Sequence, residues 1–183
     1  MIIPKLLVVL SGLIILGAGL ARWWFWSRQR TKGQRKECSI TVEQLYERMG
    51  LQKKKAGDYR DAAALGNALR DGGLWLLEKD GIKIAKRRRT GWWNLKILPF
   101  LVVIIYVFAI FVAKTAAPWV LGIGAAAVAF HVINRISTLR VELEAVKRGW
   151  AQLEKKGGLH RMDEIEQVLE CARASAWNTI LPW

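Results

Sequence analysis

Cysteine and histidine are scarce in this sequence of 183 residues. It contains two cysteines, Cys38 and Cys171, and two histidines, His131 and His160. Neither cysteine belongs to a C-x-x-C pair, and no group of metal-ligating residues lies near either one in the sequence. We therefore expect two free thiols in the cytoplasm, where disulfides are rare, and no metal centre.

Sequence motifs of catalytic sites are also missing. The sequence has no H-E-x-x-H, no G-x-S-x-G, no P-loop and no G-x-G-x-x-G. Asp61 and Asp71 have no evident partner in the sequence. These absences predict that the protein is not an enzyme. The carboxylates near the C-terminus are expected to form a solvated helix face: Glu142, Glu144, Glu164, Glu166 and Glu170.

Acidic side chains are few as well, with 15 Asp and Glu against 29 Lys and Arg and a formal net charge of +14. The imbalance is local. Residues 22–91 hold 18 Lys and Arg against 8 Asp and Glu, whereas residues 134–183 hold 8 against 7. The basic excess thus lies between two apolar regions, where Lys and Arg keep the flanks of membrane spans in the cytoplasm.

Long apolar runs are what the sequence has in abundance, above all in residues 92–133. Between Ile97 and Ile133, only Lys114 and His131 have side chains that can carry a charge at neutral pH. A bilayer core of about 30 Å needs roughly 20 helical residues, so this stretch suits two spans. Lys114 and the Thr-Ala-Ala-Pro that follows mark the break. We expect a transmembrane hairpin of 97–113 and 119–133, with its turn at the far surface.

The N-terminal residues 1–21 form a third apolar run. Gly19-Leu20-Ala21 has the small-x-small pattern of a signal-peptide cleavage site. Arg22, Arg28 and Arg30 follow closely and favour a retained span whose N-terminus is outside. Aromatic residues that prefer the headgroup level stand at all three expected boundaries: Trp23, Trp24, Phe25 and Trp26, then Trp92 and Trp93, then Trp119.

Residues 27–91 have the pattern of a small folded module. Thr41 and Gln44 form a capping-box pattern for a first helix, which Gly50 ends. Asp58 is placed to cap a second helix, which the Asp-Gly-Gly of residues 71–73 ends.

Two extended runs, 74–77 and 82–86, then meet through Asp80-Gly81, which is a β-hairpin signal. The order helix, helix, hairpin resembles the layout of a reduced winged-helix module. We therefore expect an α+β fold here. Its predicted core consists of Leu45, Leu65, Leu69, Trp75 and Ile82.

The module ends in a basic run of four residues shortly before the second span. Such a run sets orientation and binds anionic lipid at roughly 1 kcal/mol per charge, so we predict a lipid-surface role without nucleic acid. A membrane-tethered nucleic-acid-binding regulator is the alternative that the basic module leaves open. The residues of this run are Lys86, Arg87, Arg88 and Arg89.

Residues 134–183 have the pattern of a helical hairpin followed by an apolar tail. Apolar residues spaced three and four apart run from Ile136 to Leu153, and Gly157-Gly158 ends that helix. A last helix begins near Asp163. In the third span, Gly122 and Ala126 have the small-x-x-x-small spacing that allows close packing on another helix, either of this chain or of a partner. We predict partner contacts at these small residues and at Leu143, Trp150, Trp177 and Trp183.

His131 is the one residue with a specific cofactor hypothesis. An ionisable residue within a span suggests function, and neutral imidazole ligates haem iron and other metals. Ala127, one turn earlier, leaves room for a flat macrocycle. The Ala-x-x-x-His pattern resembles the pigment-ligating segment of light-harvesting antenna polypeptides, and this resemblance implies haem or a chlorophyll-type pigment at His131. The alternative is an interfacial histidine bonded to a carbonyl or a headgroup.

These observations predict an α-helical membrane protein of three transmembrane helices, located in the inner or cytoplasmic membrane with its C-terminus in the cytoplasm. The expected parts are a span in 1–26, the basic α+β module in 27–91, the transmembrane hairpin in 92–133 and the helical hairpin with its tail in 134–183. The expected function is that of a non-catalytic accessory subunit of a membrane complex, whose partners are lipids and other subunits. The alternatives are the nucleic-acid-binding regulator and the pigment- or haem-binding subunit.

Overall fold

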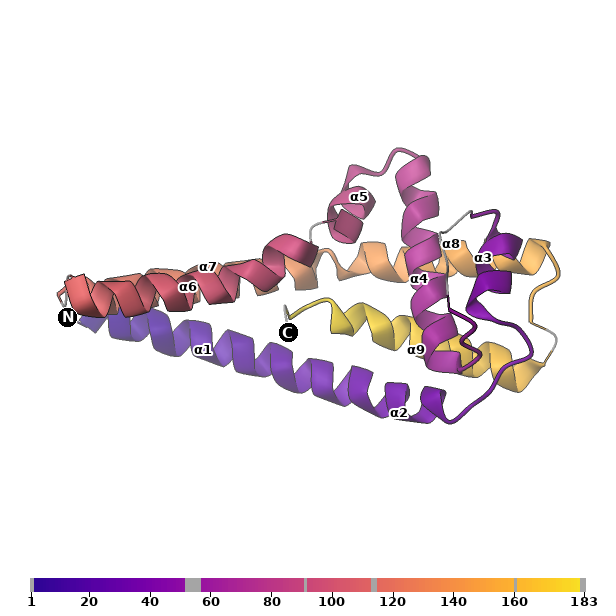
Figure 1. The fold of residues 1–183 in the computed structure, drawn as a ribbon, viewed down its shortest axis with the longest axis horizontal. Helices are drawn as coiled ribbons and strands as arrows, with labels where there is room; N and C mark the ends of the chain where they lie inside the picture. Colours follow the sequence, from indigo (N-terminus) through magenta and orange to yellow (C-terminus); the bar gives the residue numbers. More distant parts are fainter. Residues whose placement is uncertain (1, 52–56, 91, 113–114, 160, 182–183) are drawn as a thin grey trace. The chain divides into compact units, whose positions relative to one another are not determined.

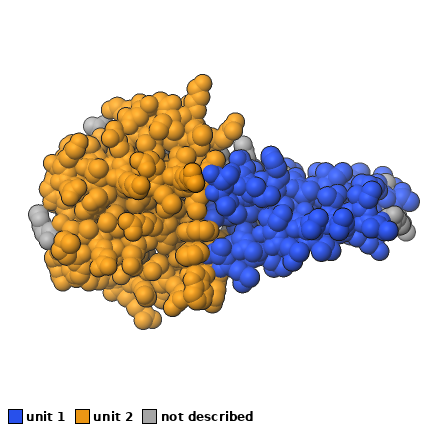
Figure 2. Space-filling view, turned by 180° about the vertical axis from the view of Figure 1, so that it is seen from behind, with its two compact units in different colours: residues 1–21, 91–137, 179–183 blue, residues 22–90, 138–178 orange. Residues whose placement is uncertain are grey.

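Helices provide the regular structure of the described chain (Figure 1). The computed structural model describes residues 2–51, 57–90, 92–112, 115–159 and 161–181, with the backbone alone at residues 89, 90, 92–96, 98 and 99. Within these ranges there is no β-strand, only an isolated bridge between Glu37 and Asp61. The chain divides into two compact units, coloured separately in Figure 2.

Unit 1 comprises Met1–Ala21, Gly91–Ser137 and Thr179–Trp183. Its helices are α1 (Ile2–Arg22), α6 (Trp92–Val112) and α7 (Ala117–Ser137). Among the described residues, two helical runs are long and apolar enough to cross a membrane, Ile2–Gln34 and Ala117–Lys155, and Phe100–Val112 is a shorter apolar helix. The gap between α6 and α7 agrees with the predicted break, although Lys114 itself lies outside the described residues.

Glycines bring the helices of unit 1 close together. A Cβ atom on Gly124 would lie 2.5 Å from Cγ1 of Val102, so α6 and α7 approach more closely there than any larger residue permits. A Cβ atom on Gly122 would lie 3.2 Å from the carbonyl oxygen of Pro4 in α1. The small residue Gly122, predicted to contact either this chain or a partner, thus packs within its own chain.

Unit 2 comprises Arg22–Thr90 and Thr138–Asn178. Helix α4 lies at its centre and packs against α2, α3, α5, α8 and α9. The elements are the π-helical turn η1 (Trp23–Ser27) and the helices α2 (Arg28–Gln34), α3 (Val42–Met49), α4 (Ala62–Lys79), α5 (Lys83–Thr90), α8 (Leu139–Lys155) and α9 (Met162–Asn178).

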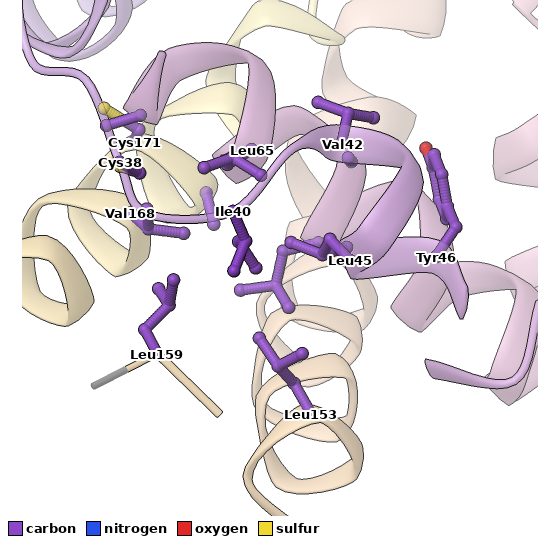
Figure 3. Packing of buried hydrophobic residues seen from close by; sticks show 14 of the residues in the cluster. Cys38, Ile40, Val42, Leu45, Tyr46, Leu65, Leu153, Leu159, Val168 and Cys171 are labelled. Atoms are coloured by element: carbon purple, nitrogen blue, oxygen red, sulfur yellow. The ribbon is translucent and has the colours of Figure 1, made fainter. Parts of the chain in front are cut away.

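The core of unit 2 gathers apolar side chains from α3, α4, α8 and α9 (Figure 3). Leu45, Leu65 and Leu153 are fully buried there. Cys38 and Cys171 are free, as predicted, and both are buried in this cluster. Burial, helped by Glu164, raises the pKa of Cys38 to about 11, and burial also raises the pKa of Cys171. Thiols in such surroundings are poor nucleophiles.

The capping predictions for the first helix of the module are confirmed. The hydroxyl of Thr41 accepts from the N–H of Gln44, the Gln44 side chain accepts from the N–H of Thr41, and α3 ends at Gly50 in the left-handed region. The second helix begins later than expected. Asp61 and not Asp58 caps α4, by accepting a hydrogen bond from the N–H of Ala64 at 2.9 Å.

The predicted α+β module is wrong, because α4 runs through the Asp-Gly-Gly of residues 71–73 and no β-hairpin follows among the described residues. The reason is tertiary packing. A Cβ atom on Gly73 would lie 1.8 Å from the carbonyl oxygen of Ala145, so this glycine allows α8 to cross α4 at backbone contact. Trp75 and Ile82, predicted in the core, are instead 38% and 39% exposed.

Candidate functional site

Large apolar side chains face outward on the helices of unit 1. Leu13 is 63% exposed, Ile104 63% and Phe130 72%. Water-soluble proteins expose single apolar residues, but contiguous apolar surfaces of this kind mark contact with a membrane or another protein. The exposed set extends along all three helices: Leu6, Val9, Leu10, Leu16 and Leu20 in α1, Phe100, Val103, Ile105, Phe108 and Phe111 in α6, and Trp119, Ile123 and Ile133 in α7.

A buried ion network in unit 2 joins α5 to α8. Arg88 is 5% exposed and Glu142 is 1% exposed, and Nη1 of Arg88 lies 2.8 Å from Oε1 of Glu142. Nε and Nη2 of Arg88 donate to the hydroxyl of Thr138 at 3.0 and 2.6 Å. Burial lowers the pKa of Arg88, and Glu142 opposes that effect. Arg88, which the sequence predicts to bind anionic lipid, therefore has its guanidinium enclosed by protein partners.

Arg70 brings α4 and α9 into the same network. Its Nε lies 3.4 Å from Oε2 of Glu142, Nη2 lies 2.8 Å from Oδ1 of Asp71, and Nη1 donates to the carbonyl of Ser175 at 2.6 Å. The pKa of Arg70 is raised, because Asp71 and Glu142 outweigh the effect of burial. Two arginines and two carboxylates thus balance in charge, which lets Arg70, Arg88 and Glu142 stay ionised while they are buried, whereas Asp71 is partly exposed. Asp71, without evident partner in the sequence, has one here.

Two carboxylates predicted on a solvated face are buried, so that prediction is wrong for Glu142 and Glu164. Glu164, in the first turn of α9, is 2% exposed and accepts from the N–H and the hydroxyl of Ser39 at 3.2 and 2.8 Å. Burial of a carboxylate is costly unless protein partners compensate its lost hydration. Ser39 donates hydrogen bonds to Glu164, and Arg88 donates one to Oε1 of Glu142. Glu144 and Glu166 are exposed as expected.

The other residues of the predicted lipid-binding run differ in what the structure describes of them. Lys86 and Arg87 lie on the exposed side of α5, whereas the side chain of Arg89 lies outside the described part of the chain. Lys83, Ile84 and the ring of Trp75 are also exposed in unit 2. Nζ of Lys79 lies 5.7 Å from the centre of the Trp75 ring.

The predicted partner-binding residues of the C-terminal part are more enclosed than the sequence suggested. Trp150 is half-buried and packs against the core of unit 2, and Leu143 is half-buried. In the tail, Ile180 and Leu181 are buried. Trp183 lies outside the described residues. Val146 and Leu153, which share the predicted apolar spacing of this helix, are buried in the core of unit 2.

In the third apolar helix, Ala126 and His131 are half-buried and Ala127 is exposed. Nε2 of His131 has no hydrogen-bond partner among the described residues. Of the predicted boundary aromatics, Trp24 and Trp119 are exposed and Trp26 is buried. Those at residues 92 and 93 have side chains outside the description.

An open pocket of about 180 Å³ lies where η1 and α2 pack against α9. Sequence reasoning missed it, because its two walls are 141 or more residues apart along the chain. Phe25 and Trp177 stack at one side, with ring centroids 4.6 Å apart and an interplanar angle of 21°. The lining residues are Phe25, Gln29, Glu170, Arg173, Ala174 and Trp177.

No protein-family model, no curated protein and no solved structure matches this chain.

Proposed function

We propose that this chain is an integral membrane protein in which α1, α6 and α7 span the bilayer and unit 2 lies in the cytoplasm. Its proposed role is that of a non-catalytic accessory subunit of a membrane complex. The observation that carries the proposal is the outward-facing apolar surface of unit 1, which includes Leu13, Ile104 and Phe130. In water this surface drives aggregation, whereas in lipid it matches its solvent.

Helical backbone supports the same proposal. Every backbone polar group of a span must find its partner within the segment, and α-helices provide this. Helix α6 carries no charged residue from residue 97 to its end at Val112. A signal sequence or the core helix of a soluble protein has similar composition, but a core helix hides the side chains that α6 exposes.

Flanking charges favour a cytoplasmic unit 2. Arg28 and Arg30 follow α1, Lys86 and Arg87 precede α6, and Arg140 follows α7. Lys and Arg close to span ends are retained in the cytoplasm. The N-terminus and the turn between α6 and α7 then lie outside.

Membrane integration is tested first by extraction of native membranes at alkaline pH, which releases peripheral proteins. We expect the chain to stay in the pellet. Topology is tested with two single cysteines at exposed positions, Thr115→Cys and Ala151→Cys. A membrane-impermeant maleimide added outside should label the first and not the second. The parent protein is the control, since Cys38 and Cys171 are buried. Labelling of both from one side overturns the hairpin.

The accessory role is tested by purification in mild detergent and identification of co-purifying chains. Trp75 is an exposed ring on α4 of unit 2, whereas Trp150 packs on the core. We expect Trp75→Ser to reduce the yield of partners while unit 2 remains folded. Purification of this chain alone, at full yield and from native membranes, contradicts the accessory role.

A pigment- or haem-binding subunit is a second candidate, because Nε2 of His131 has no partner among the described residues. A visible absorption band in the purified protein, lost in His131→Ala, supports it. A spectrum with protein absorbance alone removes it. The nucleic-acid alternative rests on the basic excess of residues 22–91 alone, because the described residues form no winged-helix strands.

A further inference from the structure

The pocket between η1, α2 and α9 has charges of both signs at its edge. Glu170 and Arg173 are one turn apart on α9 and both line it. Neighbours at this spacing commonly form an ion pair. No ion pair is recorded for either side chain in the part of the chain that the structure describes. A carboxylate and a guanidinium therefore stand about one helical turn apart, each available to a ligand.

The opposite wall supplies an acceptor without a donor. The side-chain oxygen of Gln29 is buried and accepts no hydrogen bond among the described residues. A buried acceptor without a donor is costly, so a donor that enters the pocket compensates it after a small rotation of the amide. Phe25, four residues before Gln29, belongs to the π-helical turn η1. Such turns are frequent at functional sites.

The aromatic side of the pocket suits a cation. Phe25 and Trp177 stack there, and ring faces attract ammonium groups. Glu170 and the oxygen of Gln29 accept N–H donors, whereas Arg173 pairs with an anion. The complementary ligand is a zwitterion with a primary ammonium group and an anionic group a few atoms apart.

We propose that this pocket binds a phosphoethanolamine group, and that its source is the headgroup of a membrane phospholipid. The ammonium donates hydrogen bonds to Glu170 and Gln29, and the phosphate accepts them from Arg173. The choice of a lipid source rests on the proposed membrane function. Helix α1 runs directly into η1, whose exposed Trp23 and Trp24 favour the headgroup level.

Native mass spectrometry of the full-length protein in detergent tests this with phosphatidylethanolamine and phosphatidylcholine of identical acyl chains. Choline has no N–H, so it cannot donate to Glu170 or Gln29. We expect the wild type to retain the ethanolamine lipid at least about tenfold more strongly, because charge-assisted hydrogen bonds are lost with choline. Glu170→Gln should reduce that preference by about tenfold. Glu166→Gln, exposed one turn earlier on α9, is the matched control and should keep the wild-type preference.

Each result decides the proposal. Equal retention of both lipids by the wild type, or an unchanged preference in Glu170→Gln, overturns it. Arg173→Gln should weaken the binding of both lipids equally, since both headgroups carry the phosphate. Free O-phosphoethanolamine is added as a competitor at millimolar concentration. If the competitor displaces the lipid when both are present at the same concentration, the ligand chemistry is supported and the lipid source is overturned.

Alkaline extraction of the same variants separates this proposal from the proposed function. A chain that is released from membranes contradicts the spans, and the soluble competitor then still tests the pocket. A chain that stays in the membrane but shows no headgroup preference contradicts the pocket alone.

Discussion

The two units are both helical, yet they distribute apolar side chains in opposite ways. Unit 1 exposes Leu13, Ile104 and Phe130, whereas unit 2 buries Leu45 and Leu153 completely. Unit 2 even buries two carboxylates and compensates each with protein partners. Helical structure is therefore no guide to the solvent. The placement of side chains around each helix does indicate the surrounding medium, because apolar groups face the medium in which their exposure costs the least free energy.

Replacement of a buried carboxylate should have the largest effect. Glu142→Gln removes the charge that balances Arg88 and contributes to balancing Arg70. Loss of one partner from a buried ion network costs about 3–5 kcal/mol, because a buried charge is left without compensation. We expect unit 2 to lose that much unfolding free energy, measured by pulse proteolysis in urea on the full chain in nanodiscs.

Glu144→Gln on the same helix is the control. Glu144 lies 3.8 Å from Lys147, and both side chains are largely exposed, so its loss should change stability by less than about 1 kcal/mol. Equal effects of the two substitutions contradict a structural role for the network.

An arginine on each unit's exposed apolar surface tests the proposal that unit 1 lies in lipid and unit 2 in water. Ile104 in α6 is 63% exposed and Met162 at the start of α9 is 77% exposed. Ile104→Arg should reduce membrane insertion by about 3–4 kcal/mol, the difference between the two residues at mid-span. Met162→Arg should leave insertion and stability unchanged, because water already surrounds that site. Membrane insertion of Ile104→Arg is measured by glycosylation mapping, and the stability of Met162→Arg is measured by pulse proteolysis. Tolerance of arginine at both positions excludes a bilayer around unit 1.

Local signals in the sequence predicted much of the fold. The capping box of Thr41 and Gln44, the end of α3 at Gly50 and the break after Val112 each depend on a few neighbouring residues. The residues that form these signals satisfy backbone groups within one turn, so their spacing is legible without the tertiary structure.

Features that depend on residues far apart in the sequence could not be predicted from it. The Asp-Gly-Gly that contains Gly73 predicted the end of a helix, but Gly73 lies inside α4 at the point where α8 crosses it. Arg88 read as one more charge in a basic run, because only the fold brings Glu142 to it. The pocket of Phe25 and Trp177 is formed by residues 25–29 and 170–177, and no spacing rule connects residues so far apart in the sequence.

Substitution of a glycine by alanine should also affect the two units differently. A Cβ atom on Gly73 meets the carbonyl of Ala145 at 1.8 Å, whereas a Cβ atom on Gly12 of α1 meets nothing within 4 Å. Backbone cannot move aside as a flexible side chain does, so Gly73→Ala should cost unit 2 about 3 kcal/mol, the upper end of overpacking costs. Gly12→Ala should have no such cost. Pulse proteolysis compares the two variants, and a stable Gly73→Ala protein contradicts the close helix crossing.

The smallest effect concerns the thiol of Cys38, and it appears only at alkaline pH. Burial raises the pKa of this thiol from its ordinary value of 9.0 to about 11 in the folded unit. The folded state therefore keeps the proton that the unfolded chain releases. The contribution to stability is complete below pH 9 and is lost as the pH rises towards 11. Because one pKa unit corresponds to about 1.4 kcal/mol, the loss over the two units from 9.0 to about 11 is about 2.7 kcal/mol. We measure it as the unfolding free energy of wild type minus that of Cys38→Ala at each pH, which cancels the titration of other groups. That difference should fall between pH 9 and 11 and stay constant from pH 6 to 8. A difference that does not change with pH shows that the thiol ionises equally in both states and is therefore not enclosed in the core of unit 2.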